Sequence, residues 1–238
     1  MPNPWFQFKQ FTVWQDRCGM KVGTDGVLLG AWVNAAGPLR VLDIGTGTGI
    51  ISLMIAQRTS GKIYAVEIEK DAGEQAWGNF SKSPWAGRLH IFNTSIQDFS
   101  KNCTEKYDLI VSNPPFFNSK PKASEQKRAL ARHSDKLPIK DLVSIATQLL
   151  STNGRFAVIL PMDLRQEFIA ETSLLNLWVL RETIVKPNPQ KSPVRVLLEV
   201  AKTQPVSREI NELAIRESTG DGYSDSYKAL TKEYYLLF

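Results

Sequence analysis

Residues 113–116, Asn-Pro-Pro-Phe, have the residue types in this sequence that point most directly to chemistry. The apolar run before them, residues 107–112, is typical of a buried strand, and it must end at the prolines because neither can donate a ladder hydrogen bond. We therefore expect the Asn113 amide and the Pro114 carbonyl at a strand end, with acceptors available beside the Phe116 ring. Two acceptors and a ring suit a planar NH2 group, such as the exocyclic amine of a base or a side-chain amide.

A glycine-rich turn, residues 45–49, follows the first strand expected in the alternating part of the chain. Glycines at such a turn let the backbone approach a ligand at the carboxyl edge of an α/β sheet. The spacing Gly45-x-Gly47-x-Gly49 differs from a dinucleotide fingerprint, because Ile50 stands where its last glycine belongs. Asp43 would repel a pyrophosphate but attract the ammonium and sulfonium of S-adenosylmethionine (SAM). The turn therefore predicts a SAM cofactor.

Two more acids follow the next two expected strands. Glu67 ends the second strand, 22 residues after Gly45, and can accept both ribose hydroxyls of an adenosine. Asp98 follows the third strand and is placed to receive the adenine amine. Each acid alone could be a helix cap or a surface residue, and for Asp98 alone that interpretation is preferred. Acids at three successive strand ends nevertheless favour a cofactor site.

Strand and helix patterns alternate from about residue 39 onward. Strands are predicted over 39–44, 62–67, 89–92, 107–112 and 154–160, and helices over 48–58, 70–80 and 140–150. An earlier helix over 27–32 has Thr24 and Asp25 as candidate caps. The runs 177–186 and 194–202, joined by a proline-rich turn, predict an antiparallel hairpin at one sheet edge. This order predicts an α/β fold with a parallel sheet and helices on both faces.

Composition sets the broad class of the protein. The 238 residues are 42% hydrophobic and 22% charged, which describes one sizeable globular domain, with no linker that would divide it. No apolar run approaches the roughly 18 residues that span a bilayer, and the N-terminus shows no signal-peptide pattern. Cys18 and Cys103 make no metal or redox spacing. We expect a cytoplasmic protein without membrane or metal partners.

Positive charge is concentrated just after the Asn-Pro-Pro-Phe turn. The chain has a net charge of +5, and residues 113–140 alone have seven basic and two acidic residues, also a balance of +5. The basic residues of this segment include Lys120, Lys122, Lys127, Arg128 and Arg132. A charge run is usually a solvated surface loop. Its position beside a candidate base pocket makes a nucleic acid an equally good interpretation.

With both motifs in place, residues 20–202 resemble the class I SAM-dependent methyltransferases. The resemblance implies a Rossmann-like, seven-stranded, mostly parallel sheet with an antiparallel last strand. Asn-Pro-Pro-aromatic narrows the likeness to amino-methyltransferases. Residues 8–11 (FKQF), 16–32 (DRCGMKVGTDGVLLGAW), 128–133 (RALARH) and 227–235 (YKALTKEYY) resemble the bacterial tRNA1(Val) adenine-N6 methyltransferases.

This resemblance implies transfer of the SAM methyl group to the N6 amine of the adenine 3′ of a tRNA anticodon, with Asn113, Pro114 and Phe116 at the reacting base. It also places Lys21 and Thr24 in the SAM pocket. Residues 1–36 would cover the site, 37–203 would form the core, and 204–238 would be a helical tail. Guanine-N2 enzymes also use Phe, so guanine in ribosomal RNA, a protein glutamine, or a non-catalytic SAM-binding RNA module stay alternatives.

Overall fold

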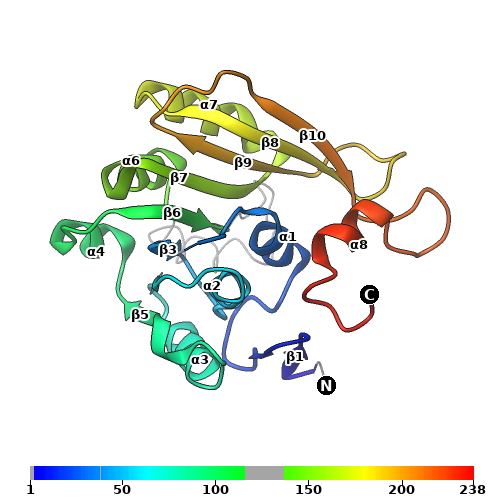
Figure 1. The fold of residues 1–238 in the computed structure, drawn as a ribbon, viewed down its shortest axis with the longest axis horizontal. Coiled ribbons are helices and arrows are strands. Elements are labelled where there is room, and N and C mark those ends of the chain that lie inside the picture. Colours follow the sequence, from blue (N-terminus) through cyan, green and yellow to red (C-terminus); the bar gives the residue numbers. More distant parts are fainter. Residues whose placement is uncertain (1–2, 38, 116–136) are drawn as a thin grey trace, which may run out of the picture.

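The computed structural model describes residues 3–37, 39–115 and 137–238. An eight-stranded sheet of order β10-β8-β9-β7-β6-β3-β4-β5 runs through it (Figure 1). Its strands are β3 Val41–Ile44, β4 Ile63–Glu67, β5 Leu89–Asn93, β6 Tyr107–Ser112, β7 Leu150–Pro161, β8 Trp178–Lys186, β9 Arg195–Ala201 and β10 Glu209–Ala214. The five strands β3 to β7 pair with one another in parallel, and β9 is antiparallel to both β7 and β8. The predicted mostly parallel sheet and the antiparallel hairpin of β8 and β9 are confirmed, but β10, and not the hairpin, forms this edge of the sheet.

The eighth strand corrects the predicted count of seven. β10 lies within residues 204–238, which were expected to be a helical tail, and it pairs in parallel with β8. Its sequence, EINELA, does not alternate between apolar and polar residues, and in the structure only Leu213 of the six is buried. The unpaired edge of β8 supplies the hydrogen-bond ladder instead, and this tertiary contact decides the conformation. Helix α8, Asp225–Thr231, is the helical part of the tail.

Helices cover both faces of the sheet, as the alternating pattern predicts (Figure 1). Helices α1 (Thr24–Trp32), α2 (Ile50–Ala56), α3 (Lys70–Ser81) and α8 share one core, and α4 (Ile96–Asn102), α6 (Ile139–Leu149) and α7 (Arg165–Leu174) share the other. Successive residues of β3 serve the two cores in turn: Val41 packs in the first and Leu42 in the second. Two short 3-10 turns, Ala86–Arg88 and Met162–Leu164, complete the elements of this region.

The expected caps of α1 were wrong. The cap of α1 is Gly23, which makes no side-chain cap bond, whereas Thr24 and Asp25 are already helical. Asp25 instead accepts a hydrogen bond from Arg195 Nε at 2.8 Å. The connection after β5 is the helix α4, which begins after Ser95; the Ser95 side chain accepts a hydrogen bond from Asp98 N and so satisfies a backbone donor of the first turn.

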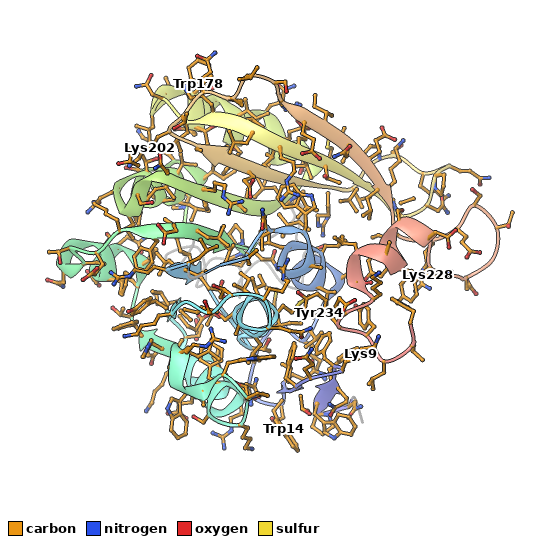
Figure 2. All side chains as sticks on the ribbon, in the orientation of Figure 1. Lys9, Trp14, Trp178, Lys202, Lys228 and Tyr234 are labelled. Atoms are coloured by element: carbon orange, nitrogen blue, oxygen red, sulfur yellow. The ribbon has the colours of Figure 1, made fainter. Side chains whose placement is uncertain are left out.

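The two ends of the described chain meet beside α2. Strands β1 (Trp5–Gln7) and β2 (Thr12–Trp14) form a separate antiparallel hairpin. The amide of Lys9, in the turn of this hairpin, donates to the carbonyl of Tyr234, in the C-terminal tail, at 2.8 Å, and the two residues lie near each other in Figure 2. Tyr227 of α8 and Tyr234 of the tail are both buried and belong to the same core as α1 and α2.

Candidate cofactor and substrate site

The predicted motifs come together because β3 and β6 are neighbours. Ile44, the last residue of β3, is the register partner of Ser112, the last residue of β6. The Ser112 hydroxyl donates to the Ile44 carbonyl at 2.9 Å and fixes the two strand ends. The next residue of each strand is Gly45 on one side and Asn113 on the other. The Asn-Pro-Pro turn and the glycine turn therefore lie side by side at the carboxyl edge of the sheet, where α/β proteins bind their ligands.

The glycine turn leaves open space in front of its backbone. Gly45, Gly47 and Gly49 have φ of +72°, +56° and +82°, a region that residues with a Cβ rarely adopt. A Cβ added at Gly45 or Gly47 would meet nothing within 4 Å, whereas one at Gly49 would come within 2.5 Å of the Phe80 ring. Gly49 is therefore required by packing, and the two earlier glycines expose backbone that a ligand can approach.

Asp43 is the fully buried acid of the site. Its Oδ2 accepts hydrogen bonds from Thr46 Oγ1 at 2.6 Å and Ser52 Oγ at 2.7 Å, which join the turn to the first turn of α2. Its Oδ1 has no hydrogen-bond partner among the described residues. Burial raises the pKa of Asp43 to about 6, against the lowering effect of the two hydroxyls. A buried acceptor without a partner fits a ligand that brings a cationic donor.

The Glu67 carboxylate at the end of β4 is held by backbone on both sides. Gly47 N donates to Oε2 at 2.8 Å, and Glu69 N donates to Oε1 at 3.0 Å. The Asn93 side chain also donates to the Glu67 carbonyl at 2.8 Å, which ties the strand end to β5. Each carboxylate oxygen keeps acceptor capacity. The arrangement presents a fixed carboxylate that can accept two vicinal hydroxyls.

Asp98 has a local structural role in the first turn of α4. Ser95 Oγ donates to its Oδ2 at 2.9 Å and Lys101 Nζ donates to its Oδ1 at 2.8 Å, and these hydrogen bonds, that of Lys101 first, lower the pKa of Asp98. The spacing Ser95-x-x-Asp98 is that of a capping box, a signal visible in the sequence. Its predicted contact with adenine stays a prediction.

Other predicted residues have less structural context. Lys21 and Thr24 are exposed, on the segment that enters α1. Asn113 is half-buried and Pro114 is buried. Phe116 and the basic residues Lys120, Lys122, Lys127, Arg128 and Arg132 lie outside the described residues. Sequence reasoning missed Thr46 and Ser52, which stand three and nine residues after Asp43. Their hydroxyls donate hydrogen bonds to the Asp43 carboxylate. Hydroxyl residues at these two positions were the signal in the sequence.

The residues present fit SAM. The unpartnered Asp43 oxygen suits the ammonium, the fixed Glu67 carboxylate suits the ribose, and the open space before Gly45 and Gly47 admits the ligand between them. Among the residues the structure describes, no three His, Cys, Asp or Glu side chains gather as a metal site would require. In the same ranges no helix has both the length and the apolar character to cross a bilayer.

This fold and site define a SAM-dependent methyltransferase. The model of the methyltransferase small domain family matches residues 23–184. The sheet also resembles that of solved methyltransferases, among them a predicted O-methyltransferase from Agrobacterium tumefaciens (TM-score 0.66, 17% identity, 88% of this chain and 96% of that one). A TehB-like SAM-dependent methyltransferase from Corynebacterium glutamicum gives a TM-score of 0.51 at 15% identity, over 78% of this chain and 90% of that one.

Curated relatives narrow the class. The chain is 44% identical to the tRNA1(Val) (adenine(37)-N6)-methyltransferase of Parabacteroides distasonis over 99% of both chains. It is 46% identical to proteins of the same name from Phocaeicola vulgatus, over 99% of both chains, and from Flavobacterium johnsoniae, over 97% of this chain and 99% of that one. The chain belongs to the family of tRNA1(Val) (adenine(37)-N6)-methyltransferases, and the resemblance read from its sequence is confirmed.

Proposed function

We propose that this enzyme methylates the N6 amine of adenine 37 in tRNA1(Val). The observation that carries the proposal is the adjacency of the two turns: Asn113 and Gly45 follow residues that are register partners in β6 and β3. An amine acceptor site thereby stands next to a cofactor turn. The names of the full-length relatives support the choice of tRNA and of adenine.

Asn113 and Pro114 would orient the amine. Its lone pair is delocalised into the ring, so it is a poor nucleophile. If Asn113 Oδ1 and the Pro114 carbonyl each accept a hydrogen bond from the amine, its nitrogen becomes more tetrahedral. The same hydrogen bonds stabilise the positive charge that develops on the nitrogen during transfer, by about a few kcal/mol. Orientation of the two reactants contributes more, about 7–11 kcal/mol. The methylated amine is acidic enough to lose its proton to water, so no general base is required.

Cofactor residues follow the geometry of the carboxyl edge. SAM, when bound, supplies an electrophilic methyl group on its sulfonium. Asp43 would hold the ammonium through its unpartnered oxygen, Glu67 the ribose hydroxyls, and Gly45 and Gly47 would let the backbone approach. We also assign Lys21 and Thr24 to the pocket on family resemblance, and Asp98 from its position after the third strand of the alternating part. Of these, Asp98 is the weakest, because Ser95 and Lys101 already use both of its oxygens.

The tRNA would be held by the basic residues Lys120, Lys122, Lys127, Arg128 and Arg132, with Phe116 stacked on the target base. A stacking contact of this kind contributes about 1–3 kcal/mol per base. Residues 1–36 would cover the site, in keeping with a single domain, and the cytoplasm is where a tRNA substrate would be met. Guanine N2 and a protein glutamine are the alternative acceptors, since each offers an amine of similar shape.

Labelled SAM and unmodified bulk tRNA provide the test. We expect N6-methyladenosine in the nucleoside digest, and N2-methylguanosine or label confined to protein would overturn the assignment. The Asn113→Ala variant should lose at least a hundredfold in turnover while its affinity for SAM stays within about tenfold, because the lost acceptor acts on the amine. Full turnover by Asn113→Ala would show that the proposed orientation of the amine is wrong.

A further inference from the structure

Residues 14–22 form a strap that leads from β2 to Gly23, the cap of α1. Part of this strap is fastened to α3, the helix that follows β4 and Glu67. The fastening is made by side-chain amides of α3 that bond to strap backbone. Backbone that pairs with side chains in place of a sheet ladder or a helix depends on those side chains for its position.

Asn79 is the first of these amides and is almost fully buried. Trp14 N donates to its Oδ1 at 2.9 Å, and its Nδ2 donates to the Trp14 carbonyl at 2.9 Å, so the amide pairs with Trp14 as a neighbouring strand would. The second hydrogen of Nδ2 goes to the Thr48 carbonyl at 2.8 Å. One side chain thus joins the strap, α3 and the glycine turn.

Gln75 lies one helical turn before Asn79, on the same face of α3. Its Oε1 accepts a hydrogen bond from Arg17 N at 2.9 Å. Within the strap itself, Gln15 closes a loop, because its Oε1 accepts a hydrogen bond from Val22 N at 2.8 Å. All three glutamine and asparagine side chains belong to residues that are at most 7% exposed. Their hydrogen bonds are therefore protected from exchange with water.

Cys18 lies in the loop that Gln15 closes. Cys18 stands next to Arg17, and the Glu67 charge acts on its thiol: burial first, then Glu67 and Asp16, raise the pKa of Cys18 to about 12. Since Asn79 also bonds to the Thr48 carbonyl at 2.8 Å, a strap that leaves α3 would loosen the glycine turn as well as expose the Cys18 thiol.

We propose that Gln75 and Asn79 are positioning residues for methyl transfer, which hold the strap against α3 and the glycine turn so that it walls the ribose side of the SAM site. Neither residue touches the reacting atoms in this scheme. Their effect passes through Arg17, Trp14 and Thr48 to the binding of the cofactor. The inference rests on the proposed role of Glu67 in that site.

Gln75→Met is the decisive variant, because methionine fills a similar volume but has no strong acceptor for Arg17 N. We expect its SAM dissociation constant to rise about tenfold, with turnover at saturating SAM within twofold of the wild type. Alkylation of Cys18 by iodoacetamide should become at least threefold faster, with Cys103 as the internal reference in peptide mass spectrometry. Gln75→Glu keeps an acceptor oxygen, so its SAM dissociation constant and its rate of Cys18 alkylation should both stay within about threefold of the wild type.

Gln57→Met is the matched control. Gln57 also joins a helix end to a distant segment, since its Nε2 donates to the Glu233 carbonyl at 3.1 Å, but that segment is the C-terminal tail. This control should leave SAM affinity and Cys18 alkylation unchanged. Asn79→Ala removes three hydrogen bonds and should weaken SAM binding more than Gln75→Met does, together with a lower melting temperature.

A folded Gln75→Met enzyme with wild-type SAM affinity and wild-type Cys18 alkylation would overturn the positioning role. An equal loss of SAM affinity in Gln57→Met would overturn it too, because any lost contact between a helix and a distant segment would then weaken SAM binding. The variant Glu67→Ala separates this inference from the site assignment. If Glu67→Ala binds SAM normally, the assigned site is wrong; if only Gln75→Met is silent, the site stands and the strap inference is wrong.

Discussion

Two buried carboxylates stand in different parts of the sheet and are treated in opposite ways. Glu182, in β8, is fully buried and is surrounded by guanidinium groups: Arg165 donates to both of its oxygens, at 2.5 and 3.1 Å, and Arg208 also donates to Oε2. Asp43, in β3, is equally buried, but it has two neutral hydroxyls on one oxygen and no partner on the other among the described residues.

The difference separates a carboxylate used for structure from one kept for a ligand. An ion in the interior is tolerated when groups of the chain neutralise it, as the two arginines do for Glu182. At Asp43 the chain supplies hydroxyls but no cation, so the folded protein keeps a charge that is incompletely compensated. A cationic ligand completes the set. The same uncompensated charge that lowers the stability of the free protein therefore favours the binding of a cation at this position.

Glu182→Ala should give the largest change in stability. The two guanidiniums would lose their common counter-ion, and we expect the free energy of unfolding to fall by about 3 kcal/mol, at the low end for a buried pair because both arginines reach solvent. Denaturant titration measures this fall. SAM affinity of the folded fraction should stay unchanged, and a tenfold loss of affinity would erase the distinction between the two acids.

Asp43→Asn should weaken SAM binding without lowering the stability of the fold. The amide has nearly the same shape but no charge for the ammonium, so we expect the SAM dissociation constant to rise by about 30-fold or more by isothermal titration calorimetry. Since a buried charge is removed, the free energy of unfolding should stay the same or rise by about 1–3 kcal/mol. A destabilised variant with normal SAM affinity would place Asp43 with Glu182, as a structural acid.

Acid pH should imitate that substitution in the wild-type enzyme. The pKa of Asp43 is raised from 3.8 to about 6, so protonation below about pH 6 removes its charge, and SAM affinity should fall by up to tenfold per pH unit there. Because the folded pKa is the higher one, the contribution of Asp43 to stability is best at low pH. It is lost as pH rises from about 4 to 6 and is constant above that range. Asp43→Asn should abolish this pH dependence of affinity.

Asp98→Ala should have the smallest effect of the acid substitutions. It removes a side chain whose partners are Ser95 and Lys101 at the exposed start of α4. Because these contacts are exposed to solvent, we expect a melting temperature close to that of the wild type and a SAM dissociation constant within threefold of it. A loss of affinity beyond tenfold would return Asp98 to the cofactor site with Asp43 and Glu67.

Much of the sheet and of the ligand edge could be predicted from the sequence. Strands such as residues 107–112 are continuous apolar runs, and Gly45 and Pro114 restrict the backbone by their own covalent structure. Each of these signals depends on a few consecutive residues, so it can be recognised in a single sequence without knowledge of distant contacts.

What could not be predicted depends on a partner far along the chain. β10 is a strand because β8 has an open edge, and the short hairpin of β1 and β2 has only three residues in each strand. Gln75 and Asn79 look like ordinary polar residues of a helix until the strap is seen against them. Glu182 could not be matched with Arg208, 26 residues away, by any periodicity.

The outermost strand has a consequence for how the protein behaves in a crowded solution. β10 presents the open edge of the sheet, and an open edge invites another chain to add a strand there. Its exposed residues include Glu209 and Glu212, and Glu212 is tied to Lys186 at 2.7 Å. These charged side chains flank Ile210, the exposed large apolar residue of the strand, and so break up an apolar docking strip along this edge. The strand that escaped prediction has no regular apolar alternation, and its two glutamates help to protect the sheet from growing into an aggregate.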